Sequence, residues 1–354
     1  MPAWFAARQP GELHFDFALP GSTHGLELSD HASHELRWVP GKAHTGQGCL
    51  ELEIDGKDPA PADLFFKASY IRADFEGERY EPVFSPRVYP GQVVSCWMKS
   101  CQTAPAEIVV TPFVTRAMAG DRIDLPAVTL PREAWKQIAF SVPDLEGDQV
   151  HDIGWKIEIA PQEPPWALGK VYVDDIRVTG PMEYTIDLNR QRMEFGEPTP
   201  FSTNDCDARL DQGMLCLRTG KANAAQAFTG NYYMRSASLE AEVIVDAGDT
   251  AGLILRGQGC RRYYALGFSG RDRVSISKWE DGKRTDLASR EFPWMYGKTY
   301  SLRAEAREDC LTLRIGNETV LEVRDGSLAY GMLGVCQGEG TASRWSGFHI
   351  AASV

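Results

Sequence analysis

Hydrophobic and polar residues alternate over short stretches along most of this chain, while apolar stripes with helical spacing are hard to find. Side chains of a β-strand point alternately to the two faces of a sheet, so this pattern predicts strands that bury one face. The clearest predicted strands are 50–54, 93–99, 107–114, 136–142, 153–159 and 170–178 in the first half, and 213–218, 239–245, 252–256, 263–268, 274–279, 299–306, 311–315, 319–323 and 331–335 in the second.

Turn-forming dipeptides separate these stretches, among them Pro90-Gly91, Asp281-Gly282 and Gly316-Asn317. Many short strands with such turns between them are typical of sandwiches and barrels. At 354 residues the chain exceeds one ordinary core, and Gly180-Pro181 follows a predicted strand. We therefore predict an all-β protein of two tandem antiparallel β-sandwich (jelly-roll) domains, residues 1–180 and 181–354.

The charge and composition of the chain limit the classes of partner that it is expected to bind. The net charge of −12 disfavours nucleic acid and anionic lipid, and no run of apolar residues is long enough to span a bilayer. A neutral sugar is not penalised by this charge, and a cation such as calcium is favoured. The first residues do not resemble a signal peptide, so we expect a cytoplasmic protein if Met1 is the native start. The eight cysteines form no CxxC pair, and most lie in apolar runs, which indicates buried thiols in a reducing compartment.

Several segments of the first half follow one another in a recognisable order. They are Phe15-Asp16-Phe17, the run from His44 to Leu52, the run Val88-Tyr-Pro-Gly to Trp97-Met-Lys99, Trp135-Lys-Gln-Ile, and Val171-Tyr-Val-Asp-Asp-Ile-Arg-Val178. Together they resemble the carbohydrate-binding modules of xylanases and cellulases, which have a galactose-binding-like jelly roll. The resemblance implies a structural calcium ion, with Asp16 and either Asp174 or Asp175 as ligands, because calcium binds carboxylate and carbonyl oxygens. We expect no organic cofactor.

Two aromatic residues of the first half alternate with core residues and so fall on polar faces. Trp97 shares its face with Ser95 and Lys99, and Phe113 shares its face with Thr111 and Thr115. An exposed ring can stack on the apolar C–H face of a sugar, so both are candidate ligand-binding residues. The alternative is that each ring lies under a loop or against the other domain.

The second half contains a more distinctive order of segments. It runs through Ala251-Gly-Leu-Ile-Leu-Arg256, Arg262-Tyr-Tyr-Ala-Leu, Val274-Ser-Ile-Ser-Lys-Trp-Glu-Asp-Gly282, Tyr300-Ser-Leu-Arg and Leu313-Arg-Ile-Gly-Asn to Asp325-Gly. This order resembles the concanavalin/laminin-G-like jelly rolls. That resemblance implies the fold but little about function, because such domains include lectins, hydrolases and passive spacers.

Polar residues of these strands alternate with apolar ones and could line a concave sheet that binds sugar hydroxyls. The alternative is a solvated outer face with cross-strand ion pairs, since one face of an antiparallel sheet is often polar. The candidates are Glu242, Arg256, Trp279, Arg303 and Glu305.

Short catalytic signatures such as GxSxG, HExxH and a P-loop are missing, which weighs against an enzyme without excluding one. The sequence therefore favours a non-catalytic carbohydrate-binding protein, an accessory region of a larger carbohydrate-active enzyme, with an oligo- or polysaccharide as partner. One alternative is a β-sandwich glycoside hydrolase or lyase with paired carboxylates, such as Glu240/Glu242 or Glu280/Asp281. The other alternative is a structural or assembly region of a multidomain enzyme.

Overall fold

The computed structural model describes residues 13–29, 34–55, 61–68, 88–102, 107–159, 168–194, 196–220 and 224–353. The regular elements within these ranges are all β-strands, and none of these residues forms a helix that could span a bilayer. The chain divides into two compact units. One contains residues 1–143 and 149–180, and the other contains residues 144–148 and 181–354.

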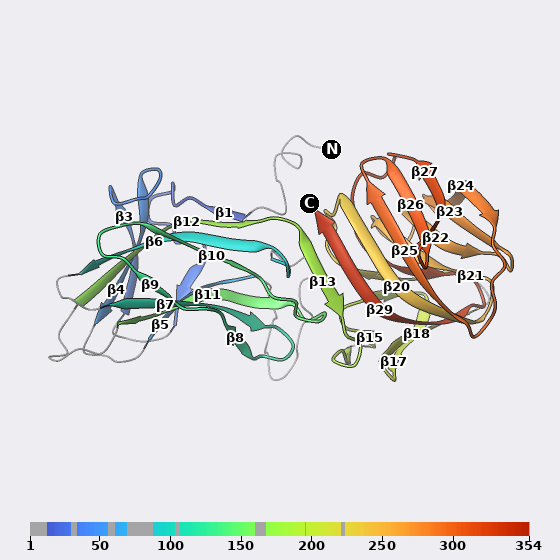
Figure 1. Cartoon of the computed structure of the whole chain (residues 1–354), viewed down its shortest axis with the longest axis horizontal. Helices are drawn as coiled ribbons and strands as arrows, with labels where there is room; N and C mark the ends of the chain where they lie inside the picture. The colour runs from blue at the N-terminus through green and yellow to red at the C-terminus, as the bar shows by residue number, and fades with distance from the viewer. Residues whose placement is uncertain are drawn as a thin grey trace. The chain divides into compact units, whose positions relative to one another are not determined.

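In the first unit the described strands form two antiparallel sheets, named here after a central strand (Figure 1). The β12 sheet has the order β10 (Lys136–Ser141), β6 (Val93–Gln102), β12 (Leu168–Thr179), β4 (Gly48–Asp55) and β3 (His34–Pro40), with β1 (Leu13–Phe15) also pairing with β12. The β11 sheet has the order β2 (Leu26–Leu28), β5 (Ala62–Lys67), β11 (Val150–Ile159), β7 (Ile108–Arg116) and β8 (Arg122–Asp124), with β9 (Val128–Leu130) on β7.

The described strands of the second unit form two larger antiparallel sheets and a short ribbon, from β13 in green to β29 in red (Figure 1). The β29 sheet has the order β17 (Cys206–Asp211), β18 (Met214–Thr219), β29 (Ala342–Ser353), β20 (Ser236–Ala247), β25 (Thr299–Arg307), β26 (Cys310–Ile315) and β27 (Glu318–Arg324), with β13 (Met182–Ile186) on β29. The β22 sheet has the order β16 (Ser202–Asn204), β19 (Ala225–Thr229), β28 (Met332–Gln337), β21 (Thr250–Gly257), β22 (Tyr263–Ser269), β23 (Arg273–Glu280) and β24 (Lys283–Glu291). The ribbon is β14 (Met193–Glu194) with β15 (Glu197–Pro198).

The predicted fold class is confirmed, because the alternating residues do bury one face of each sheet. On β6, Val94, Cys96 and Met98 are completely buried, whereas Trp97 between them is half-buried. All eight cysteines are free thiols.

Neighbouring strands of the β22 sheet approach closely at three glycines. A Cβ atom on Gly334 would lie 2.2 Å from the carbonyl oxygen of Ala227, and one on Gly267 would lie 2.5 Å from that of Ala251. At Gly252 the corresponding distance, to Leu266 O, is 2.8 Å. These contacts involve backbone atoms, which cannot rotate away as a side chain can. The strands in this part of the sheet can therefore pair as they do only with glycine at these positions.

Gly334→Ala tests this constraint. We expect it to lower the free energy of unfolding by about 1–3 kcal/mol, because the added methyl group forces the β19 and β28 backbones apart. Thermal and denaturant unfolding of the whole chain would measure the loss. Gly326→Ala is the matched control, since its Cβ would make an ordinary 3.6 Å contact, and it should change stability by less than about 0.5 kcal/mol. Equal stability of the two variants would contradict the proposed backbone contact.

Candidate functional site

The outward face of the β12 sheet contains a buried carboxylate, Glu51 on β4, which is 2% exposed. Arg37 Nε and Lys170 Nζ each donate a hydrogen bond to its Oε1 at 3.0 Å. Burial raises the pKa of Glu51, but hydrogen bonds with Tyr172, Arg37 and Lys170 outweigh that effect and lower the pKa to about 2. Glu51 is therefore a charged group that holds three neighbouring strands of the first unit together.

A second buried carboxylate on this face, that of Asp174 on β12, fixes the loop between β3 and β4. Its Oδ2 accepts backbone N–H groups from His44 at 2.7 Å and Thr45 at 2.9 Å, and its Oδ1 accepts that of Asp175 at 2.8 Å. Burial nevertheless raises the pKa of Asp174 above its ordinary value. The bonds hold the loop over the sheet, and the His44 ring stacks on Trp97 with a centroid distance of 3.9 Å.

The two predicted aromatic candidates of the first unit are thus covered by neighbouring groups. His44 covers one face of the half-buried Trp97 ring. Phe113 is 4% exposed, and the Arg122 guanidinium lies 3.7 Å from its ring centroid. The alternative interpretation was that each ring lies under a covering element. It holds for the whole Phe113 ring and for one face of the Trp97 ring. Phe113 is therefore not an exposed sugar platform, because its ring is sandwiched between Arg122 and the β11 backbone at Gly154.

The predicted calcium ligands have protein partners instead. Asp174 binds three backbone N–H groups, as above, and Asp175 Oδ1 pairs with His14 and Arg177. Asp16 Oδ1 accepts the backbone N–H of Ala18 at 3.1 Å. No three His, Cys, Asp or Glu residues of the described ranges are grouped closely enough to hold a metal ion. As placed, these carboxylates do not fit a calcium ion, which needs about 6–8 oxygen ligands.

The outer face of the β22 sheet, by contrast, carries an open pocket whose volume, with the solvent space at its mouth included, is about 380 Å³. We call it the β22 groove. Its floor consists of small residues that lie directly opposite one another on adjacent strands: Gly252 pairs with Gly267, which pairs with Ser275, and Ala265 pairs with Ser277. The full lining is Ala224, Thr250, Gly252, Tyr263, Ala265, Gly267, Phe268, Ser269, Ser275, Ser277, Trp279, Arg284, Cys336, Gln337 and Gly338.

Two aromatic rings form one wall of the groove. Tyr263 on β22 lies directly opposite Trp279 on β23, and the rings stack with a centroid distance of 5.8 Å and an interplanar angle of 15°. The Tyr263 ring is buried against Phe228, and its hydroxyl accepts a hydrogen bond from Gln226 at 3.2 Å. Trp279 is only partly buried. The pair thus presents one accessible ring on a fixed support.

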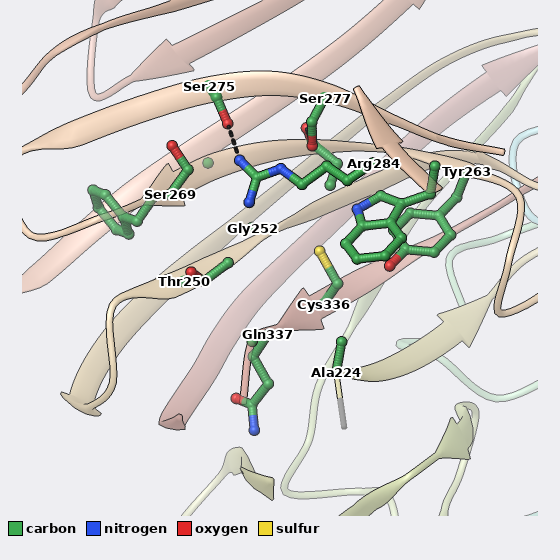
Figure 2. Close-up of a pocket in the computed structure, with 15 residues that line it drawn as sticks. Ala224, Thr250, Gly252, Tyr263, Ser269, Ser275, Ser277, Arg284, Cys336 and Gln337 are labelled. Atoms are coloured by element: carbon green, nitrogen blue, oxygen red, sulfur yellow. Dashed lines mark hydrogen bonds between the residues drawn. The ribbon is translucent and has the colours of Figure 1, made fainter. Parts of the chain in front are cut away.

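Arg284 on β24 extends along the floor, and Figure 2 shows its guanidinium group at Ser275. Its Nη2 donates to Ser275 Oγ at 3.3 Å, and the Asp286 carboxylate lies 2.9 Å from both Nε and Nη2. Cys336 Sγ also faces the groove (Figure 2), and burial raises the pKa of this thiol to about 12. The groove therefore places one partly exposed guanidinium beside an aromatic wall, and the Ser275 and Ser277 hydroxyls and the neutral thiol are buried in its lining.

The structure places only Trp279 of the five predicted second-half residues in this groove. Glu242, Arg303 and Glu305 lie on strands of the β29 sheet instead, where they contact Ser346, Glu240 and Arg307, respectively. Arg256 is 3% exposed and donates hydrogen bonds to the carbonyls of Arg235, Leu328 and Glu308. The prediction of one shared surface is therefore wrong. Alternation shows which residues of a strand point to the same face, but it does not show which sheet the strand joins. The Arg256 side chain is used to hold loops through their carbonyl groups.

Arg284 and Tyr263 are among the groove residues that the sequence interpretation missed. The predicted turn at Asp281-Gly282 contained a signal for Arg284. A two-residue turn pairs Glu280 with Lys283, and the next pair outward, which points to the opposite face of the sheet, is Trp279 with Arg284. Tyr263 lay in a predicted strand, but sequence alternation did not show which strand would lie beside Trp279.

No family model and no curated protein matches the chain. Among solved structures, the chain is similar to the carbohydrate-binding module CBM66 from Bacillus subtilis, with 16% identity, 42% of this chain and 94% of that chain covered, and a TM-score of 0.39. It is similar to the CBM22-1–CBM22-2 tandem domain of Xyn10C from Paenibacillus barcinonensis, with 12% identity, 96% and 97% covered, and a TM-score of 0.36. It is also similar to the exoplasmic/lumenal domain of VIP36, with 13% identity, 42% and 82% covered, and a TM-score of 0.33. At these identities and TM-scores the likenesses carry no weight for what this chain binds.

The lowered pKa of Glu51 predicts acid sensitivity in the first unit. The folded pKa of about 2 lies below the ordinary value of 4.5, so the carboxylate contributes stability above about pH 4.5 that is lost as the pH falls towards 2. We expect Glu51→Gln to reduce the free energy of unfolding by about 3 kcal/mol at pH 7, and by much less near pH 2. Denaturant unfolding at a series of pH values would measure this difference. The exposed Glu107→Gln is the control and should show no such trend; a pH-independent effect of Glu51→Gln would contradict the assignment.

Proposed function

We propose that the chain is a non-catalytic carbohydrate-binding protein and that the β22 groove binds the sugar. The observation that carries the proposal is the accessible Trp279 ring, stacked on Tyr263, beside a floor of small residues and hydroxyl groups. A sugar ring has an apolar C–H face and a polar edge of hydroxyls. Such a ligand needs an aromatic surface with hydrogen-bonding groups next to it.

The physical details of the groove favour this kind of ligand. Gly252, Gly267 and Ala265 leave room above the strands, so a flat ring can lie close to the backbone. The partly exposed Arg284 guanidinium can donate to sugar hydroxyls, and the buried Ser275 hydroxyl accepts a hydrogen bond that helps to hold it. Because Tyr263 is buried and hydrogen-bonded, the supporting ring keeps its orientation, which lowers the entropy cost of binding at Trp279.

A binding role is better supported than hydrolysis or lysis at this groove. The described lining residues include no Asp or Glu, whereas most glycosidases place two carboxylates at the scissile bond. The carboxylates considered as alternative pairs are held elsewhere: Glu280 contacts Arg262 and Lys278, and Glu240 contacts Ser301 and Arg303. We further propose that the chain serves as an accessory region of a larger carbohydrate-active enzyme.

Trp279→Ala tests the proposed function. On an array of plant, microbial and animal oligosaccharides, followed by calorimetry with the strongest binder, we expect the variant to lose at least about tenfold in affinity. The reason is that the sugar loses its stacking surface. Tyr296→Ala is the matched control in the same unit, since this 41% exposed ring does not line the groove, and it should bind as the wild type does.

Trp97→Ala, measured in parallel, distinguishes a sugar site in the first unit from one in the second. Retained binding in Trp97→Ala together with loss in Trp279→Ala would assign the sugar to the second unit. The opposite result would overturn the assignment to the β22 groove and move the site to the first unit. Silence across the array, with all variants folded, would contradict carbohydrate binding for the sugars tested. The same array run with calcium and with chelator tests the calcium prediction, which the carboxylate contacts of the first unit do not support.

A further inference from the structure

The charge of the β22 groove differs from that of the whole chain. The chain has a net charge of −12, yet Arg284 is the one lining residue within the described ranges whose side chain is charged at neutral pH. The other polar groups that face the floor are neutral hydroxyls and amides. The Cys336 thiol is neutral as well, because burial raises its pKa to about 12. The lining residues themselves therefore contribute a positive charge and no negative one, and the carboxylate that pairs with Arg284, that of Asp286, is not among them.

The guanidinium forms an ion pair with Asp286 but keeps unused N–H groups. A single carboxylate oxygen, Oδ1 of Asp286, contacts both Nε and Nη2, and Nη2 also donates to Ser275 Oγ. Nη1 has no hydrogen-bond partner among the described residues. A planar guanidinium with unused N–H groups can donate to a second carboxylate in a fixed geometry.

The position of Arg284 relative to the aromatic wall fits one class of sugar. Arg284 lies directly opposite Trp279 in the β23–β24 pairing, and such cross-strand neighbours have Cβ atoms about 4.5–5.5 Å apart. The guanidinium then bends along the floor to Ser275 (Figure 2). A sugar ring stacked on Trp279 would direct a substituent at its edge towards Arg284.

The geometry points to an acidic sugar as the ligand, namely a hexuronic acid residue whose carboxylate pairs with Arg284 while its ring stacks on Trp279. This inference rests on the proposed function and makes it more specific. The carboxylate would bind the unused N–H groups of Nη1, while Ser275 and Asp286 hold the guanidinium in place through Nη2 and Nε. A neutral hexose with the same ring would keep the stacking contact and lose the charge-assisted hydrogen bond.

Matched sugars test this inference on the full chain. We would measure calorimetric affinities for trimers of galacturonic acid and of galactose, and for the methyl glycosides of glucuronic acid and of glucose. The wild type should bind the acidic member of at least one pair about tenfold more tightly. Arg284→Gln should remove that preference by weakening the acidic ligand about tenfold and the neutral one less than about threefold. Arg284→Lys should restore part of the preference, because it keeps the charge without the planar fork.

Arg209→Gln is the matched control. Arg209 on β17 also pairs with an aspartate two residues away, Asp207, but lies on the β29 sheet with its side chain 72% exposed. Its loss should leave the preference unchanged, so a similar effect in both variants would indicate only long-range attraction and overturn the inference.

The remaining outcomes separate the inference from the function on which it rests. Equal binding of acidic and neutral sugars, lost in Trp279→Ala, would overturn the acidic preference and leave carbohydrate binding intact. Tighter binding of a sulfated hexose than of the uronate would overturn the assignment of a carboxylate. Binding of none of these sugars, together with silence across the array, would overturn both.

Discussion

The close approach of backbones across the β22 sheet is the constraint on which the candidate site depends. Gly252, Gly267 and Gly334 bring neighbouring strands to distances at which a Cβ atom would collide with a carbonyl oxygen. The same absence of side chains leaves the floor of the groove low, so the Tyr263–Trp279 pair stands above it as a wall. Sheet pairing and the shape of the groove thus have a common cause. A larger residue at Gly252 or Gly267 would therefore have two effects at once: it would fill the floor of the groove and push the neighbouring strands apart.

The two units use charged side chains differently. In the first unit, buried carboxylates are fully engaged: Glu51 joins β3, β4 and β12, and Asp174 holds the β3–β4 loop. A buried charge must be paired or hydrogen-bonded in this way, because leaving it unpaired costs several kcal/mol. In the second unit, Arg256 satisfies its charge with three backbone carbonyls, while Arg284 keeps unused N–H groups at the surface. Free donors beside an aromatic ring are available to a ligand in a way that the internal pairs are not.

The alternation pattern predicted the fold class well, because it reports directly which side chains a sheet buries. The prediction failed for strands whose alternation is interrupted or whose two faces are both exposed. The central strand β29 was missed, since a bulge opposite Glu240 and Glu242, with Gly347 at a φ of 62°, shifts its alternation midway. The edge strand β24 was missed because an edge strand can remain exposed on both faces and then shows no hydrophobic period. Trp279 was predicted correctly as an outward-facing ring, but its partners could not be, because they depend on which strands become neighbours.

The missed edge strand supplies the residue that makes the groove chemically specific. A strand in the centre of a sheet has neighbours on both sides, and the described part of β24 pairs only with β23. Its side chains are therefore free to bend back over the sheet, as Arg284 does when its guanidinium reaches Ser275. Aromatic stacking on Trp279 is tolerant of sugar identity, because many sugars present an apolar face. A guanidinium group discriminates more sharply, since its N–H groups have fixed directions and its charge is permanent. In this arrangement the central strands provide a general platform for sugars, and the edge strand provides the means to select among them.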